Sequence, residues 1–309
     1  MKFLNLYPLP ILSKYFEKII TGKAIEFPIA IEKRLIEMDY GRFELLMKSG
    51  EGLAKNKDLI IGALMHNVGT RASASMQRFF KIGRFFRSYK VAVYENNSTD
   101  TLTKQYLELY KSNPNCNIIS ENNSTGPAIT GRKPTSQALH DQTRFIKMAM
   151  FRNQLKKQIY DLSQNHYEST EDLLVLICDG DLSLGISPRG ILQCLNYDFD
   201  AIFPYTYENC IWLHYYDTLA YESSEGYRIL GNCPKSLAPL FKKSYLRKIK
   251  GIHLVNSAFG GAGLYKWNAF SSSNYNEDGK DCEHIDFHSS MRLAGYNKLF
   301  INRNFIGVR

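Results

Sequence analysis

Two aspartates separated by one glycine follow a run of apolar residues in the middle of the sequence. Leu173–Cys178 is apolar throughout and leads directly into Asp179, Gly180 and Asp181. Two carboxylates at this spacing can turn toward one hard cation, because the glycine leaves room for a metal ion or a phosphate near the backbone. Taken alone, the triplet is more typical of a turn. Its position after an apolar strand favours a metal site that neutralises a diphosphate.

Polar residues also follow two earlier apolar runs. Leu59–Met65 leads into His66-Asn-Val-Gly69, and Lys90–Tyr94 leads into Glu95-Asn-Asn-Ser-Thr-Asp100. In an open α/β sheet, ligands bind beyond the carboxyl ends of the strands. The three polar strand ends therefore predict a nucleotide crevice. The sequence has no G-x-G-x-x-G after the first strand and no G-x-x-x-x-G-K-[ST], so neither a dinucleotide fingerprint nor a P-loop is supported.

The second half of the chain carries a glycine-rich segment and a helix with paired histidines. Asn256–Trp267 places Gly260 and Gly261 among aromatic residues, as expected for a tight turn or for close approach of the backbone to a ligand. His284 and His288 are four residues apart and share one face of the predicted final helix. They could bind a metal ion or an acceptor, and a capped surface helix explains them equally well.

Strands and helices alternate through the first half of the sequence, which predicts βαβ units and a mostly parallel, buried sheet. Residues 1–57 read as an α-helical extension, residues 121–136 as a loop, and the pattern becomes mixed beyond Pro188. The expected strands are Leu59–Met65, Lys90–Tyr94, Cys116–Ser120, Leu173–Cys178, Ala201–Tyr205 and His253–Ala258. The expected helices are Ser73–Phe86, Thr101–Tyr110, Gln137–Ser163, 188–196, 235–248 and Cys282–Leu293.

Composition narrows the class of protein. The chain of 309 residues is 44% hydrophobic, which allows a substantial core. It has no apolar run of about 18 residues and no secretory signal, and its six cysteines lack C-x-x-C spacing. We therefore expect a soluble, cytoplasmic protein with reduced thiols. The formal charge of +9 favours partners that carry phosphate: a nucleotide, a nucleic acid or an anionic membrane surface.

Together these motifs resemble a known class of enzymes. The D-G-D triplet after a buried strand looks like the D-x-D motif of GT-A glycosyltransferases, and Val93–Thr101 is similar to a segment of the family-2-like members. The series H-N-V-G, Y-E-N-N-S-T-D, Arg144 and Phe151-Arg-Asn153 resembles the fungal capsule mannosyltransferase-like family. The resemblance covers roughly residues 58–300, and it departs from the pattern at Glu95 and Asn96, where many relatives have two aspartates.

The resemblance implies a GT-A type, Rossmann-like open sheet flanked by helices and a role for each matching residue. Asp181, with Asp179, would bind Mn²⁺ or Mg²⁺, and Glu283 or Asp281 would remove the acceptor proton. The residues implied in nucleotide-sugar binding are Asn67, Val68, Gly69, Glu95, Arg144, Arg152, Asp179, Gly260 and Gly261. Those expected to bind the acceptor are Trp212, Tyr216, His284 and His288, and the aromatic ones could equally be core residues.

The implied activity is metal-dependent transfer of a sugar from a UDP- or GDP-sugar to a hydroxyl acceptor, with residues 58–200 binding the donor and residues 201–309 the acceptor. No nucleic acid partner is expected on this interpretation. Two alternatives stay open: a nucleotidyltransferase that makes a nucleotide sugar, and a basic module that binds polyanions without catalysis. The sequence does not choose between inversion and retention at the sugar, and retention would remove the need for Glu283 as base.

Overall fold

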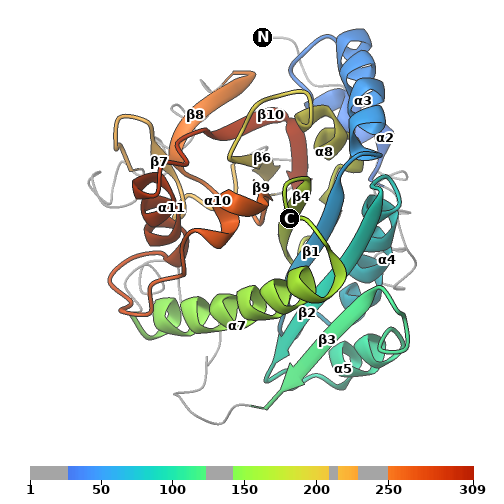
Figure 1. Cartoon of the computed structure of the whole chain (residues 1–309), viewed down its shortest axis with the longest axis vertical. Coiled ribbons are helices and arrows are strands. Elements are labelled where there is room, and N and C mark those ends of the chain that lie inside the picture. The colour runs from blue at the N-terminus through green and yellow to red at the C-terminus, as the bar shows by residue number, and fades with distance from the viewer. Residues whose placement is uncertain (1–26, 123–141, 209–214, 229–249) are drawn as a thin grey trace.

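The computed structural model describes residues 27–122, 142–208, 215–228 and 250–309. One 10-stranded sheet forms its centre, with the strand order β3-β2-β1-β4-β9-β6-β10-β8-β7 and with β5 paired to β10. Helices lie against this sheet (Figure 1). The predicted α/β class, with parallel strands flanked by helices, is therefore confirmed.

The half of the sheet that contains β1 to β4 is parallel. Strand β1 pairs with both β2 and β4, and β2 pairs with β3, all in parallel register. These elements are β1 (Asp58–Met65), α4 (Arg71–Gly83), β2 (Ser88–Asn96), α5 (Thr101–Glu108), β3 (Cys116–Glu121), α7 (Gln142–His166) and β4 (Leu173–Asp179). Parallel register brings the ends of β1, β2 and β4 to the same edge of the sheet, as the sequence predicted.

Helices bury both faces of this half, which explains its continuous apolar strands. Alternate residues of β1 point to opposite faces. Ile60 joins the core with Leu155 and Ile159 of α7, whereas Ile61 joins the core with Met76 of α4. Figure 1 shows α7 as a long helix that runs across β1 and β2.

The second half of the sheet is mixed. Strand β9 pairs antiparallel with both β4 and β6, and β10 pairs parallel with β6 and antiparallel with β8. Its elements are β5 (Gly185–Ile186), α8 (Pro188–Cys194), β6 (Ala201–Tyr207), β7 (Glu222–Ser223), β8 (Ile252–Ser257), β9 (Ala262–Lys266), α10 (Trp267–Ser271), α11 (Glu283–Leu293) and β10 (Leu299–Val308). The sequence did not predict β10, which lies between β6 and β8.

The N-terminal extension is helical where it is described. It forms α2 (Ile29–Leu35) and α3 (Tyr40–Ala54). Glu32 is almost fully buried and pairs with Arg189 of α8 at 3.0 Å. A Cβ at Gly50 would lie 1.8 Å from the carbonyl oxygen of Leu192. The two helices are thus packed closely against α8.

Parts of the sequence-based expectations fall outside the described residues. They are the first 26 residues of the helical extension, the loop from residue 123, the start of the helix expected at Gln137–Ser163, the helix expected at 235–248, and Trp212. No helix among the described residues is long and apolar enough to cross a membrane.

Candidate functional site

The loop that joins Asp179 to Asp181 lies against the end of β1. The amide of Gly180 donates a hydrogen bond to the carbonyl oxygen of Leu64 at 3.1 Å. A Cβ at Gly180 would lie 2.9 Å from that same oxygen and 2.6 Å from the Met65 side chain. Any larger residue would push the loop away from β1, so the glycine is needed for this close approach.

One face of α4 holds the backbone of this loop. Arg71 donates to the carbonyl of Asp181 at 3.0 Å, and the Ser75 hydroxyl donates to the carbonyl of Gly180 at 3.2 Å. Arg78 donates to the next two carbonyls, those of residues 182 and 183, at 3.3 and 3.0 Å. Arg71 and Ser75 are four residues apart and Ser75 and Arg78 are three apart, so helical geometry places all three donors on the same face.

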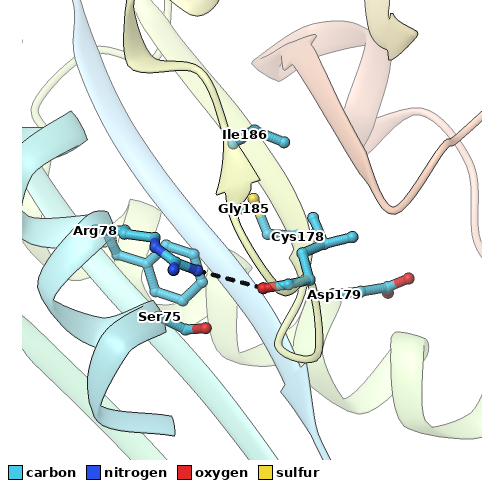
Figure 2. A pocket seen from close by; sticks show the side chains of 8 residues that line it. Ser75, Arg78, Cys178, Asp179, Gly185 and Ile186 are labelled. Atoms are coloured by element: carbon cyan, nitrogen blue, oxygen red, sulfur yellow. Dashed lines mark hydrogen bonds between the residues drawn. The ribbon is translucent and has the colours of Figure 1, made fainter. Parts of the chain in front are cut away.

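Figure 2 shows the small pocket beneath the loop, with Ser75 and Arg78 on one side and Cys178 and Asp179 on the other. Burial lowers the pKa of Arg78 to about 10, which still leaves the guanidinium charged at neutral pH. The sequence alone does not point to Arg78, because a charged residue within a helix is most often exposed.

A buried guanidinium connects Asp179 with Glu283. Arg152 of α7 contacts Asp179 Oδ1 at 3.2 Å through Nη2 and Glu283 Oε1 at 2.9 Å through Nε. The side chains of Arg152 and Glu283 are only 4% and 7% exposed. Arg152 also lies 4.7 Å from the ring centroid of Phe259. The structure therefore brings together a residue expected to bind the nucleotide sugar and a residue expected to act as base.

The charge balance around Asp179 is unusual. Burial, with the nearby charges of Asp181 and Asp217 in addition, raises the pKa of Asp179 to about 7, although Arg152 acts in the opposite direction. The charges of Asp179 and Glu283 raise the pKa of Arg152 above its ordinary value, despite its burial. Several carboxylates thus share one buried cation, which is an environment typical of functional sites.

Asp217 belongs to the same group, although the sequence alone does not point to it. Its Oδ2 accepts a hydrogen bond from the amide of Gly260 at 3.2 Å, and its φ of 65° is uncommon for a residue other than glycine. Burial and the charge of Glu283 raise the pKa of Asp217 to about 6. Asp217 stands alone in an aromatic segment, and no motif around it indicates its place in the fold.

Asp181 has a partner that the sequence alone does not predict. Arg309, directly after β10, contacts Asp181 Oδ2 at 3.0 Å through Nη2. The guanidinium carbon of Arg309 lies 4.3 Å from the ring centroid of Tyr216. Tyr216, which was expected to bind the acceptor, therefore lies beside the D-G-D loop. Since β10 was not predicted, nothing in the sequence placed Arg309 near Asp181.

The segment Asn67-Val-Gly69 follows β1 and is hydrogen-bonded to the residues that follow β2. The side-chain oxygen of Asn67 accepts hydrogen bonds from the amides of Thr99 and Asp100 at 2.7 and 3.2 Å. Val68 is buried in the core beneath α4, and the amide of Gly69 donates to the Thr103 hydroxyl at 2.8 Å. The segment lies at the expected edge of the sheet, and its contact with a nucleotide stays a prediction.

The two other residues expected at the nucleotide lie in different surroundings. Glu95 is fully buried, and its carboxylate accepts hydrogen bonds from the amide of Ser98 at 2.7 Å and from the Ser120 hydroxyl. Arg144 lies exposed on α7, two turns before Arg152. Glu95 therefore fixes the loop after β2, and the roles expected for both residues toward a nucleotide stay predictions.

The glycine turn between β8 and β9 contacts the D-G-D loop directly. Gly260 and Gly261 have φ values of 63° and 78°, in the left-handed region that favours glycine. The carbonyl of Gly261 accepts a hydrogen bond from the amide of Asp179 at 2.8 Å. The turn and the loop, distant in the sequence, therefore form one edge of the candidate site.

Helix α11 carries its two histidines on a buried face. His288 contacts the Ser257 hydroxyl at 2.8 Å and the Tyr265 hydroxyl at 3.1 Å, and burial lowers its pKa to about 3. The His284 ring stacks on that of Phe259 with centroids 3.8 Å apart, and burial holds its pKa well below the ordinary value. The interpretation as a surface helix is therefore wrong, and contact of these histidines with an acceptor stays a prediction.

Asp281 lies apart from the Arg152 network. Its Oδ1 accepts a hydrogen bond from Nη2 of Arg228 at 2.8 Å. Its side chain is 31% exposed, against 7% for Glu283. Of the two carboxylates proposed as base, Glu283 is the one in contact with the residue that binds Asp179.

No group of three or more His, Cys, Asp or Glu residues within the described ranges has the geometry of a metal site. Asp179 and Asp181 still supply carboxylate oxygens, the donors that Mg²⁺ and Mn²⁺ prefer. Mg²⁺ commonly uses one or two carboxylates together with water and substrate phosphates. The donor chemistry of the D-G-D loop therefore fits a cation that is bound together with a phosphorylated substrate.

No protein-family model matches the sequence, and no curated protein is significantly similar to it. Several solved structures are similar at low sequence identity. S. aureus TarS residues 1–349 in complex with UDP-GlcNAc has 15% identity and a TM-score of 0.45 over 82% of this chain. GalNAc-T7 with UDP, GalNAc and Mn²⁺ has 11% identity and a TM-score of 0.44, with 82% of this chain and 43% of that chain covered.

The mannosyltransferase PcManGT from Pyrobaculum calidifontis, in complex with GDP-Man and Mn²⁺, has 11% identity and a TM-score of 0.40. The match covers 91% of this chain and 68% of that one. This chain spans 58–60% of the length of the TarS 1–349 structures. At TM-scores below 0.5, these matches transfer no activity, so function has to be argued from the residues of this chain.

Proposed function

We propose that this protein is a metal-dependent glycosyltransferase that moves a sugar from a nucleoside-diphosphate sugar to a hydroxyl acceptor. The observation that carries the proposal is the buried contact of Arg152 with both Asp179 and Glu283. The resemblance implies a donor role for Asp179 and a base role for Glu283, and both residues contact the same arginine. A reaction that joins donor and acceptor needs both groups in one site.

The donor is proposed to lie along the carboxyl edge of the parallel strands. Asn67-Val-Gly69 follows β1, Glu95 follows the apolar run of β2 near the end of that strand, and the D-G-D loop follows β4. Ligands of open α/β sheets bind at this edge, where the strand order changes direction. In this sheet β1 lies between β2 and β4, so the change occurs at β1. The base and ribose would contact the first two segments, and the diphosphate would contact the third.

Asp181, together with Asp179, would hold Mn²⁺ or Mg²⁺. The ion supplies positive charge that stabilises the nucleoside diphosphate as it leaves. Arg152 keeps Asp179 in position through the 3.2 Å contact and supplies a fixed positive charge behind it. The D-G-D backbone is held by α4, so the two carboxylates keep their spacing without a ligand.

Glu283 is proposed as the acceptor base of an inverting reaction. A base must reach the acceptor hydroxyl and stay ionised until transfer. The Arg152 guanidinium holds the Glu283 carboxylate in place through the 2.9 Å contact. Asp281 is proposed as a support of the helix start instead, because it pairs with Arg228.

The test measures sugar transfer and donor hydrolysis with UDP- and GDP-sugars in the presence of Mn²⁺. We expect Asp181→Ala to abolish both activities while the thermal unfolding curve stays close to that of the wild type. Asp198→Ala is the matched control, because Asp198 is a 63% exposed carboxylate before the start of β6, at the opposite edge of the sheet. It should keep full activity.

The donor is identified first, by measuring which UDP- or GDP-sugar raises the melting temperature, since a ligand that binds only the folded state stabilises it. Undiminished turnover by Asp181→Ala in excess EDTA would refute the proposed function. Release of pyrophosphate instead of a nucleoside diphosphate would point to nucleotidyl transfer.

A further inference from the structure

Two arginines from distant parts of the sequence converge on Asp181. Arg71, the first residue of α4, donates to the Asp181 carbonyl at 3.0 Å. Arg309, directly after β10, contacts the Asp181 carboxylate at 3.0 Å. The amide of Arg309 also donates to the carbonyl of Tyr207 at 3.0 Å, which fixes the end of β10 beside β6. Both guanidinium groups are thus held at the D-G-D loop by regular structure.

These two arginines differ from Arg152 and Arg78, which are buried. The side chain of Arg309 is 29% exposed, and Arg71 is half-buried. A guanidinium has five N–H donors. Among the described residues, each of the two guanidinium groups makes one hydrogen bond, and Arg71 has no carboxylate partner there. Both therefore keep donors for a ligand.

The ligand that suits this pair is a phosphate group. Guanidinium groups bind phosphate oxygens through paired, charge-assisted hydrogen bonds. Arg71 begins a helix of 13 residues, and the positive end of the helix dipole adds to its charge. A diphosphate carries enough negative charge to engage both arginines at once.

We propose that Arg71 and Arg309 form an anion subsite beside Asp181 that binds the diphosphate of the donor, and that Arg309 competes with a divalent cation for the Asp181 carboxylate. This rests on the proposed function. Without a cation, Arg309 pairs with Asp181 through Nη2 and offers its remaining N–H donors to the diphosphate. When a cation binds Asp181, the guanidinium of Arg309 turns to the diphosphate, which lies between the two arginines.

The experiment is calorimetric titration of the full chain with UDP, GDP and inorganic pyrophosphate in EDTA, and with Mn²⁺ alone. Arg309→Gln and Arg71→Gln each remove one guanidinium. Arg84→Gln is the matched control, because Arg84 is an exposed arginine at the other end of α4. Uridine and guanosine, which lack phosphate, show whether a variant has lost the phosphate contact or the whole site.

We expect both site variants to bind the better nucleoside diphosphate and pyrophosphate about tenfold more weakly than the wild type, because each loses charge-assisted hydrogen bonds. Binding of the nucleoside and all binding by Arg84→Gln should stay within about twofold of the wild type. Arg309→Gln alone should bind Mn²⁺ more tightly, since its competitor for Asp181 is gone.

Diphosphate affinities of both site variants within about twofold of the wild type would overturn the anion subsite, as would a wild-type protein that binds neither diphosphate nor pyrophosphate in EDTA. Unchanged Mn²⁺ affinity in Arg309→Gln would overturn the competition. Pyrophosphate binding that needs both arginines, in a protein that turns over no nucleotide sugar, would keep the subsite and remove the proposed function. Sugar transfer with unaltered pyrophosphate binding in the variants would keep the proposed function and remove the subsite.

Discussion

Replacing Arg152 by methionine tests the buried ion network directly. Methionine fills similar space with an unbranched apolar chain, so the main change is loss of the positive charge. The variant leaves Asp179 and Glu283, which are 21% and 7% exposed, without the cation between them. Breaking a buried ion pair by removing one partner costs about 3–5 kcal/mol. That is a large part of the 5–15 kcal/mol by which an ordinary domain is stable.

Arg228→Met is the matched control. Arg228 also bonds a carboxylate of α11's N-terminal region, Asp281, but the two side chains are 22% and 31% exposed. Solvent screens such a pair, so its loss should cost about 1 kcal/mol or less. A third variant, Arg152→Met with Glu283→Gln, should recover part of the loss, since it removes one of the two carboxylates left without a partner.

The assay is urea unfolding followed by circular dichroism, with the free energy of unfolding taken from the midpoint and the slope. Arg152→Met should unfold at a clearly lower urea concentration than Arg228→Met, with the same slope. Equal midpoints for the two variants would refute the reasoning, because loss of a buried cation between two carboxylates should destabilise the protein more than loss of a partly exposed cation. A double variant no more stable than Arg152→Met would contradict the role given to Glu283.

Three further predictions concern the loop and the core. Gly180→Ala should lower the free energy of unfolding by about 1–3 kcal/mol, measured in urea, because its Cβ would clash with the Leu64 carbonyl. Arg78→Met should raise KM for the donor more than it raises KM for the acceptor, measured by steady-state kinetics, because two carbonyls of the loop lose their donors. The folded-state pKa of His288, about 3, lies below its unfolded value of 6.5. The unfolded state therefore binds the extra proton between these values, and stability falls as the pH falls through this range. Between pH 7 and pH 5 the wild type should lose about 2 kcal/mol more than His288→Asn in urea unfolding, and equal losses would contradict the buried neutral histidine.

The parallel half of the sheet could be predicted because its local patterns agree with its final environment. Leu59–Met65 and Leu173–Cys178 are continuous apolar runs, and both strands are buried on two faces. Polar residues directly after such runs fall at one edge of a parallel sheet, so the positions of Asn67 and the D-G-D loop followed from the order of elements alone.

Strand β10 escaped prediction for a physical reason. Asn302 and Asn304 interrupt its apolar pattern, yet both are fully buried. Asn302 donates to Gln193 at 2.7 Å, and Asn304 accepts from the amide of Glu37 at 2.9 Å. A buried amide is stable when it is hydrogen-bonded, but partners more than 100 residues away leave no local signal in the sequence. Arg309 follows this strand and was missed with it.

Helix α4 holds the D-G-D loop through its backbone and not through its carboxylates. Arg71, Ser75 and Arg78 donate to backbone carbonyls of the loop, and none of them donates to the carboxylate of Asp179 or Asp181. Replacing the Asp181 side chain therefore leaves these backbone contacts in place. Among the described residues, the side-chain contact that it removes is the one with Arg309, whose side chain is 29% exposed. Loss of activity in Asp181→Ala would thus report the missing carboxylate itself, because the fold around it does not depend on that carboxylate.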